Sequence, residues 1–164
     1  GYFWEGIPPY LLPIIAKALG PDVVAVETGT YQGDSALKFA EAFGSCTTIE
    51  RSETLGEAAQ ERFANNSRIN VLIGSSRDLL AIALPDRERA CFIWLDAHGV
   101  YDHSGADTEE NPLLAEVEVI ANMRGSRNTV IGIDDARGMG TQPGWPSTGQ
   151  ISKLLLAQGF DVIL

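Results

Sequence analysis

The sequence predicts an α/β fold in which one doubly wound, mostly parallel sheet forms a single domain over residues 1–164. Two observations lead to this prediction. Short apolar runs alternate along the chain with longer segments of helical periodicity, which is the order of strand–helix–strand units. The apolar runs are also hydrophobic on both faces, as strands buried between two layers of helices are.

The expected elements follow one another without repeats or linkers. The expected strands are 23–27, Thr47–Glu50, Ile69–Ile73, Cys91–Asp96, Thr129–Ile133 and Asp161–Leu164. The expected helices are Pro9–Leu19, Asp34–Phe43, Ser52–Ala64, Arg77–Ala83, Asn111–Met123 and Ser147–Gln158. Pro13 either kinks the first helix or marks its true start, and Ser52 is a candidate N-cap. Two long segments, 97–110 and 136–147, follow strand ends, where open α/β sheets bind their ligands.

Composition and charge narrow the class of ligand. The formal charge is −10, from 12 basic and 22 acidic residues, and the basic residues form no run. We therefore expect no nucleic acid partner, because nucleic acids are bound mainly through lysine and arginine contacts to phosphate. We also expect no membrane span, because no apolar run is long enough. Cys46 and Cys91 fall in predicted strands and are expected to be reduced core residues, which favours a cytoplasmic location.

The most informative segment is the first strand and the turn after it. A run of β-branched residues ends on Glu27, and a turn containing Gly29 and Gly33 then opens a helix. We expect Gly29 to let the backbone turn tightly against a ligand, and Gly33 to let the helix lie close to the strand. A dinucleotide-binding fingerprint is not matched, because Tyr31 and Asp34 stand where its second and third glycines belong. A P-loop is not matched either, because the turn contains no lysine.

Carboxylates recur at the carboxyl ends of four predicted strands. They are Glu27, Glu50, Asp96, Asp134 and Asp135. Gathered at one edge of a sheet, these groups would repel one another and lose hydration unless a positive charge lay among them. A sulfonium cofactor or a divalent metal ion would supply that charge.

The pattern E-x-G-x-x-x-G resembles the first motif of the class I S-adenosylmethionine (SAM)-dependent methyltransferases, in which the glycine loop holds the amino-acid end of the cofactor. From about residue 5 to residue 137 the chain is similar to the catechol and caffeoyl-CoA type of O-methyltransferase. The resemblance implies a Rossmann-like methyltransferase fold, SAM as cofactor and a small-molecule acceptor such as a polyol, sugar or catechol. It also implies a set of cofactor-binding residues, namely Glu27, Gly29, Thr30, Tyr31, Gly33, Ser35, Glu50, Arg51, Ser75, Ser76 and Asp96.

Three of these assignments have an alternative. Glu50 follows Glu27 by 23 positions, where an acid accepts the ribose hydroxyls, but it also suits a solvated acid at a helix entrance. Glu27 either contacts the cofactor or caps its loop. Ser75 and Ser76 either contact adenine or cap the next helix.

A metal site is implied by the same resemblance. In the catechol and macrocin types of O-methyltransferase, one aspartate ends the fourth strand and an Asp-Asn or Asp-Asp pair ends the fifth. These residues hold a magnesium ion that binds two adjacent oxygens of the substrate. Asp96 and the pair Asp134-Asp135 stand at those places, so a site for Mg²⁺ or another divalent cation is expected here. The alternative is that Asp134 caps its loop and Asp135 is exposed.

The sequence departs from that family at two places. The catechol type has a lysine just past the fourth-strand aspartate, whereas here Asp96 is followed by Ala97 and His98. His98 is therefore a candidate general base, a fourth metal ligand or a structural loop residue. The family also ends in a β-hairpin, and this sequence stops at Leu164, in the first strand of that hairpin. Either the chain is truncated or a second copy completes the sheet edge, so a homodimer is expected.

Three functions remain open at this point. The first is methyl transfer from SAM to a hydroxyl of a small molecule, assisted by a divalent metal ion, with Asp96 and His98 as the catalytic residues. The second is a non-catalytic module that binds SAM or a related nucleoside. The third, which needs a second histidine such as His103, is a metal-dependent hydrolase or hydroxylase on the same sheet.

Overall fold

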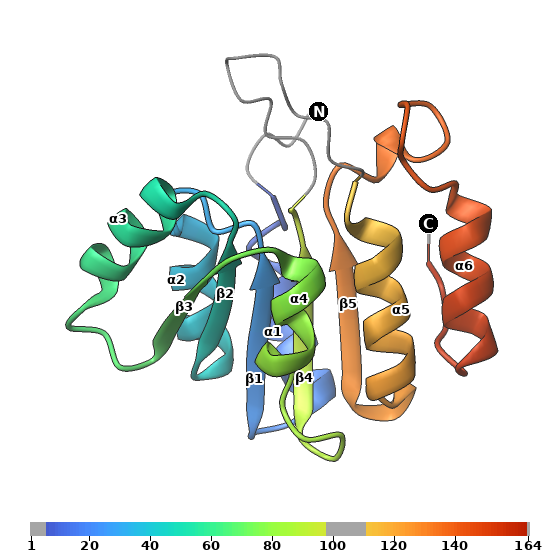
Figure 1. Cartoon of the computed structure of the whole chain (residues 1–164). Coiled ribbons are helices and arrows are strands. Elements are labelled where there is room, and N and C mark those ends of the chain that lie inside the picture. Colours follow the sequence, from blue (N-terminus) through green and yellow to red (C-terminus); the bar gives the residue numbers. More distant parts are fainter. Residues whose placement is uncertain (1–5, 98–110, 164) are drawn as a thin grey trace.

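Five parallel strands form the centre of the computed structural model, which describes residues 6–97 and 111–163 (Figure 1). The strands are β1 (Val23–Thr28), β2 (Cys46–Glu50), β3 (Ile69–Ile73), β4 (Ala90–Leu95) and β5 (Thr129–Ile133). They lie in the order β3-β2-β1-β4-β5, and each neighbouring pair is parallel. The predicted α/β architecture, with its doubly wound parallel sheet, is confirmed.

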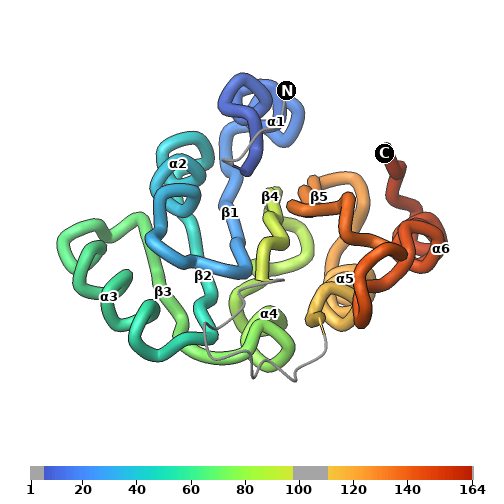
Figure 2. The backbone as a smooth tube through the Cα atoms, turned by 90° about the horizontal axis from the view of Figure 1, so that it is seen from above, coloured from blue at the N-terminus to red at the C-terminus, as the bar shows by residue number. Residues whose placement is uncertain are grey.

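Six helices cover the two faces of the sheet. They are α1 (Leu11–Leu19), α2 (Asp34–Phe43), α3 (Glu53–Phe63), α4 (Ser76–Ala83), α5 (Leu113–Met123) and α6 (Thr148–Ala157). Two short 3₁₀ turns span Ser126–Asn128 and Ala136–Gly138. Helices α1, α2 and α3 lie on one face, while α4 and α5 lie on the other with α6 beside α5 (Figure 2).

Each face has its own hydrophobic cluster, because the strands are apolar on both sides. On the side of α1 and α2, the ring of Phe39 packs edge-on against Phe92, with 5.3 Å between ring centroids. On the other side, strand residues share a cluster with residues of α4, α5 and α6. Cys46 and Cys91 are buried and not disulfide-bonded, as predicted. In the described parts of the chain, no helix combines the length and the apolar character that crossing a membrane requires.

Two local predictions about helix starts are resolved. Pro13 lies in the first turn of α1, where the backbone N–H has no partner within the helix, so the proline neither kinks nor breaks it. Ser52 is the N-cap of α3, and its hydroxyl accepts a hydrogen bond from the backbone N–H of Leu55 at 3.4 Å.

The predicted sixth strand is wrong over the residues that the structure describes. Residues 161–163 have no strand structure, and the described sheet ends at β5. A strand exists only where a neighbour supplies hydrogen bonds, and that neighbour cannot be inferred from apolar character alone. Phe160, just before this segment, is buried against the cluster on the α5 and α6 side.

The strand order reverses between β1 and β4, and this switch point positions the ligand site. Chain connections run from β1 outward to β3, then return across the sheet to β4 and β5. Ligands of open α/β sheets bind in the crevice at such a point, outside the carboxyl ends of the strands. Thr28 pairs with Leu95 at the ends of β1 and β4. The loop that starts at Gly29 therefore lies beside Asp96.

Candidate functional site

Gly29 brings the ends of β1 and β4 into close contact. It has a left-handed φ of +87°, and a Cβ atom built there would lie 2.4 Å from the backbone carbonyl oxygen of Asp96. No other residue type avoids that overlap, so glycine is required here by the backbone of Asp96, and the predicted approach to a ligand stays a prediction. The loop after β1 is thus held directly against the end of β4.

Gly33 has a different neighbour from the one predicted. It also has a left-handed φ, of +83°, but a Cβ atom there would lie 2.6 Å from the ring of Phe63. Phe63 is the last residue of α3, so this glycine makes room for a neighbouring helix and not for the strand before it. The correction reflects a contact between residues 30 positions apart, which loop spacing does not reveal.

Glu50 organises the loop after β1. Its Oε2 accepts the backbone N–H of Tyr31 at 2.9 Å, and its Oε1 accepts the N–H of Ser52 at 2.9 Å. Tyr31 has a φ of +48°, a strained value for a residue other than glycine, and the hydrogen bond to Glu50 helps to hold it. Glu50 is buried at the end of β2 and joins two loops at the carboxyl edge of the sheet.

Glu27 lies within a buried polar chain. The hydroxyl of Thr48 donates to Glu27 Oε2 at 2.7 Å, and the hydroxyls of Thr48 and Thr30 lie 2.7 Å apart. Glu27 Oε1 is buried without a hydrogen-bond partner. Burial raises the pKa of Glu27 to about 7, against weaker lowering effects of the Ser35 and Thr48 hydroxyls. A buried acid of this kind is stabilised in its charged form by a nearby cation.

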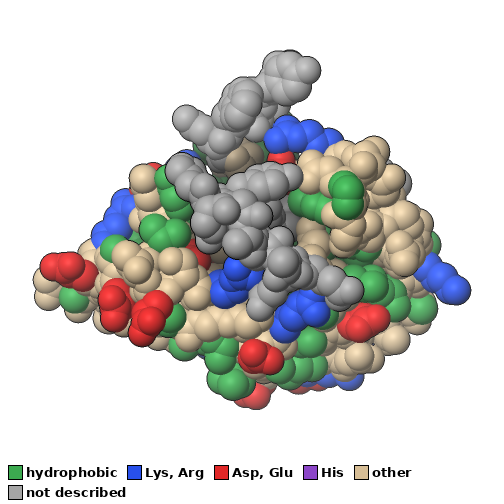
Figure 3. Space-filling model, turned by 45° about the horizontal axis from the view of Figure 1, so that its top comes forward, with side chains coloured by type: hydrophobic (Ala, Val, Ile, Leu, Met, Phe, Trp, Pro, Cys, Tyr) green, Lys and Arg blue, Asp and Glu red, His purple; other side chains and the backbone are tan. Residues whose placement is uncertain are grey.

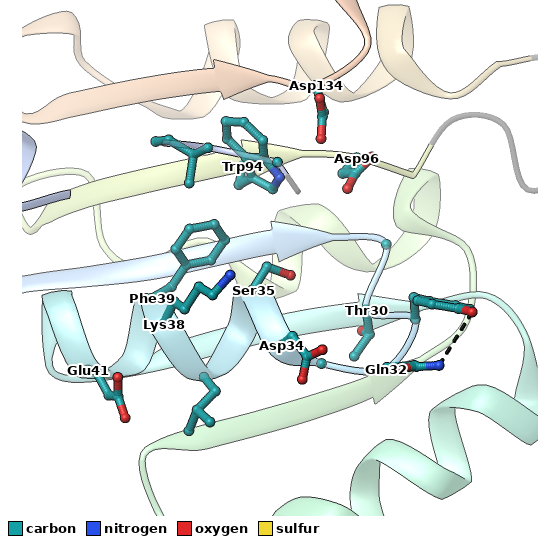
Figure 4. Close-up of a pocket in the computed structure, with 16 residues that line it drawn as sticks. Thr30, Gln32, Asp34, Ser35, Lys38, Phe39, Glu41, Trp94, Asp96 and Asp134 are labelled. Atoms are coloured by element: carbon teal, nitrogen blue, oxygen red, sulfur yellow. Dashed lines mark hydrogen bonds between the residues drawn. The ribbon is translucent and has the colours of Figure 1, made fainter. Parts of the chain in front are cut away.

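Asp96 and Asp134 lie together at the ends of β4 and β5 (Figure 4). Burial is the largest cause that raises the pKa of Asp96 to about 8, followed by the charge of Asp134 and then that of Glu27. Asp135 follows Asp134 in the chain, and its charge also contributes to raising the pKa of Asp96. It forms an ion pair with Arg137, and its own N–H donates to Asp134 Oδ1 at 2.8 Å.

A cleft of about 510 Å³ opens between the glycine loop and this acidic pair. Its walls include six of the predicted cofactor-binding residues, Gly29, Thr30, Tyr31, Gly33, Ser35 and Asp96, together with Asp134. The other predicted site residues that the structure describes do not line it. They are Glu27, Glu50, Arg51, Ser75, Ser76 and Asp135.

The two serines after β3 lie at the start of α4. Ser75 is the N-cap residue, but its side chain makes no capping hydrogen bond, and Ser76 is buried as the first residue of the helix. The capping alternative for the Ser75 side chain is therefore not observed. His98 and His103 lie outside the described residues, and so does Tyr101 of the segment 97–110, in which we expect ligand contacts.

Nine residues that line the cleft were not among the site residues predicted from the sequence. They are Gly6, Ile7, Gln32, Asp34, Leu37, Lys38, Phe39, Glu41 and Trp94. Trp94 stands two positions before Asp96 on β4, so strand alternation puts both on the same face, and that signal was available. Lys38 stands one turn after Ser35 on α2, a spacing that gains meaning only once the cleft is known.

No group of three or more histidine, cysteine, aspartate or glutamate side chains in residues 6–97 and 111–163 is arranged to hold a metal ion. Asp96 and Asp134 remain as two neighbouring carboxylates.

The described part of the face in Figure 3 carries basic side chains scattered among acidic and uncharged ones, without a continuous basic surface.

No protein-family model matches the sequence, and no curated protein matches it. Solved structures do match the fold. A methyltransferase of Podospora anserina bound to S-adenosylhomocysteine (SAH) has a TM-score of 0.58 and 19% identity, over 91% of this chain and 67% of its own. A protein assigned as a caffeoyl-CoA O-methyltransferase of Staphylococcus aureus has a TM-score of 0.57 and 18% identity, over 80% of this chain and 58% of its own.

The cyclase SpnF matches as well, with a TM-score of 0.58 and 16% identity, over 95% of this chain and 59% of its own. This chain thus spans 58% to 67% of the length of these three proteins. The likenesses establish that the chain has the class I methyltransferase fold, as the resemblance in its motifs predicts. Because a cyclase shares that fold, the chemistry has to be argued from the cleft.

Proposed function

We propose that this chain is a SAM-dependent methyltransferase that acts on a hydroxyl of a small molecule. One observation carries the proposal: the glycine loop after β1 and the carboxylates after β4 and β5 face a single cleft at the switch point of the sheet. The acceptor that fits this proposal is a polyol, a sugar or a catechol, each of which offers adjacent hydroxyls.

We assign the three parts of the cofactor to residues in the cleft and to residues at the strand ends outside it. We assign the amino-acid end to the loop from Gly29 to Ser35, where the backbone and the Ser35 hydroxyl line the cleft. We assign the ribose to Glu50. Each carboxylate oxygen of Glu50 accepts one hydrogen bond from a backbone N–H and has a second lone pair that can accept a ribose hydroxyl. The adenine then falls to the start of α4, at Ser75 and Ser76.

The charges of the site suit a cationic cofactor. Bound SAM supplies an electrophilic methyl group on a positively charged sulfur atom. The carboxyl groups of Asp96 and Asp134 lie on the cleft wall, and Glu27 is buried behind the loop. A cation bound beside these groups would favour their ionised forms, which burial alone disfavours.

Asp96 and Asp134 are also the residues that would hold a divalent metal ion such as Mg²⁺. Two carboxylates are enough, because Mg²⁺ commonly keeps water and substrate oxygens as its remaining ligands. When bound, the ion would supply Lewis-acid activation of the acceptor hydroxyl. Asp135 would join as a third ligand only after release from Arg137.

The acceptor hydroxyl must also lose its proton during methyl transfer. We keep His98 as the proposed base, because a neutral imidazole takes up a proton near neutral pH and this residue follows Asp96 by two positions. Asp96 would orient the acceptor from the end of β4.

An aspartate-to-asparagine variant tests the role of the acidic side of the cleft in binding the acceptor. Asp134→Asn should lower methyl transfer from SAM to catechol by about a hundredfold or more, while the affinity for SAH stays unchanged. Asp22→Asn is the matched control, because Asp22 is exposed before β1 and pairs with Arg89. Equal loss of SAH binding and turnover in Asp134→Asn would contradict the role proposed for Asp134.

Asp135→Asn decides between two and three carboxylate ligands. Asparagine tolerates the left-handed backbone of this position, where φ is +48°, so the change removes charge with little strain. Loss of turnover equal to that of Asp134→Asn would assign Asp135 as a ligand. Turnover close to wild type would restrict the metal site to Asp96 and Asp134.

A second candidate function is a non-catalytic module that binds SAM or a related nucleoside. The ion pair between Asp135 and Arg137 favours it, because that pair removes one of the three expected metal ligands from the cleft. SAH binding without any magnesium-dependent heat and without turnover of vicinal diols would support this alternative over the methyltransferase.

A further inference from the structure

The cleft is uneven in its charge. Most of its charged lining is acidic, with Asp34, Glu41, Asp96 and Asp134. Among the described residues that line it, Lys38 is the only basic one. Figure 4 shows the Lys38 side chain running along α2 toward Ser35, across the cleft from Asp96 and Asp134. The α2 wall therefore offers a cation and a hydroxyl, and the opposite wall offers carboxylates.

Lys38 has acidic neighbours on its own helix but does not pair with them. Asp34 lies four positions before it and Glu41 three positions after it, spacings at which helical ion pairs form. Asp34 instead binds Arg62 of α3, with 2.7 Å between the charged atoms. Within the part of the chain that the structure describes, no carboxylate lies within ion-pair distance of the Lys38 ammonium.

The cleft that Lys38 lines has apolar as well as charged walls. The adjacent residue Phe39 is fully buried, and its ring lies 6.1 Å from that of Trp94, which is also buried. Both aromatic residues line the cleft. Charges interact more strongly beside such apolar walls than in open water.

We propose that Lys38, together with Ser35, forms a subsite that binds a carboxylate of the ligand in the cleft. The ammonium group donates to the carboxylate as a charged partner, and the Ser35 hydroxyl donates a second hydrogen bond. This inference rests on the proposed function, because it takes the cleft to be the methyl-transfer site. It adds a residue that recognises an anionic group on one side of an otherwise acidic cleft.

Two sources can supply this carboxylate. One is the amino-acid end of the cofactor, which the loop from Gly29 to Ser35 holds. The other is an acceptor that carries a carboxylate next to its hydroxyls. The cleft of about 510 Å³ is lined on one side by the loop from Gly29 to Ser35 and on the other by Asp96 and Asp134, so both sources are compatible with its lining.

Binding of two cofactor fragments tests the first source. SAH carries the carboxylate, and 5′-methylthioadenosine lacks the whole amino-acid end. If Lys38 binds the cofactor, Lys38→Gln should weaken SAH binding by about tenfold in calorimetry and leave 5′-methylthioadenosine unchanged. Lys38→Arg should keep most of the SAH affinity. Lys17→Gln removes the same charge from the last turn of α1 and should change neither ligand.

Binding to the SAH-saturated protein tests the second source. Here 3,4-dihydroxybenzoate and catechol share the diol and differ by one carboxylate. If Lys38 binds the acceptor, wild type should prefer 3,4-dihydroxybenzoate by about tenfold, and Lys38→Gln should remove the preference while SAH affinity stays unchanged.

The outcomes separate this inference from the proposed function. If wild type binds SAH but Lys38→Gln changes neither SAH affinity nor the preference between the two diols, the carboxylate subsite is wrong and the cofactor assignment stands. If wild type binds neither SAH nor 5′-methylthioadenosine, the proposed function fails and the subsite fails with it. Unchanged thermal unfolding of Lys38→Gln would show that its effects come from binding and not from the fold.

Discussion

At Glu27, the stability of the free protein and the binding of a cation favour different protonation states. Its carboxyl is fully buried at the end of β1, with one oxygen bonded to Thr48 and the other without a partner. A protonated carboxyl suits that environment in the absence of a ligand, whereas a carboxylate suits a bound sulfonium. The burial of this acid is therefore consistent with a role in binding a cation.

We predict that Glu27→Gln flattens the pH dependence of stability. Burial raises the pKa of Glu27 from 4.5 to about 7, so the folded state holds more protons than the unfolded state between these values. Stability should accordingly fall as pH rises from about 5 to 8, with Glu27 contributing on the order of 2 to 3 kcal/mol. Glutamine keeps an acceptor for Thr48 and cannot ionise, so urea unfolding of this variant should lose that share of the slope.

Asp96 also contributes to the pH dependence of stability and must be considered when the two curves are compared. Its pKa is also raised, to about 8, so part of the slope should persist in Glu27→Gln. Parallel stability curves for wild type and Glu27→Gln between pH 5 and 8 would refute the account of Glu27.

At the scale of elements, the contact between the first loop and the fourth strand decides the shape of the site. Gly29 permits this contact because its position has a left-handed backbone and no space for a side chain. Gly20, after α1, also has a left-handed backbone, with φ of +96°, but no atom lies within 4 Å of a Cβ built there. A comparison of the two positions therefore distinguishes the cost of a left-handed backbone, which both share, from the cost of steric overlap, which only Gly29 would have.

We predict that Gly29→Ala is much more destabilising than Gly20→Ala. Both variants bear the left-handed penalty of about 1 to 2 kcal/mol, and only Gly29→Ala also forces the ends of β1 and β4 apart. Thermal unfolding should show a clearly larger drop for Gly29→Ala, and SAH binding should be lost in that variant alone. Equal destabilisation with intact SAH binding in both would mean that the close approach is not needed.

Elements were predictable from the sequence where local patterning determines them. The five observed strands were recognisable as short runs rich in β-branched and apolar residues, and helix starts such as Ser52 carry their own capping signals. Contacts distant in sequence were not predictable. The neighbour of Gly33 is Phe63, and the segment 161–163 has no strand partner among the described residues. Both errors come from assigning a spatial neighbour to a residue from its position in the chain.

The site was partly predictable for the same reason. Carboxylates at strand ends are placed at one edge by the parallel topology alone, so Asp96 and Asp134 could be brought together from the sequence. The pairing of Asp135 with Arg137 and the approach of Lys38 to the cleft depend on side-chain directions. Glu116 of α5 was not anticipated either: it is fully buried, and burial raises its pKa.

At the scale of the whole molecule, the open edge of the sheet suggests self-association. Strand β5 pairs with β4 on one side, and no other described strand pairs with it. Its sequence is Thr-Val-Ile-Gly-Ile, without a charge to discourage pairing with another strand.

We predict a homodimer in solution, joined along β5. Sedimentation velocity over a range of protein concentrations should show a species of about twice the 17.7 kDa chain mass. A single monomeric species at every concentration would contradict this prediction while leaving the site unaffected.

The measurement that tests the central claim most directly is calorimetric titration of the wild-type protein with SAH, with NAD⁺ titrated in parallel. The cleft, the glycine loop and Glu50 predict binding of one SAH per chain with micromolar affinity and no binding of NAD⁺, because the loop lacks the dinucleotide fingerprint. Absence of SAH binding, or binding of NAD⁺ in its place, would contradict the assignment of this cleft to SAM.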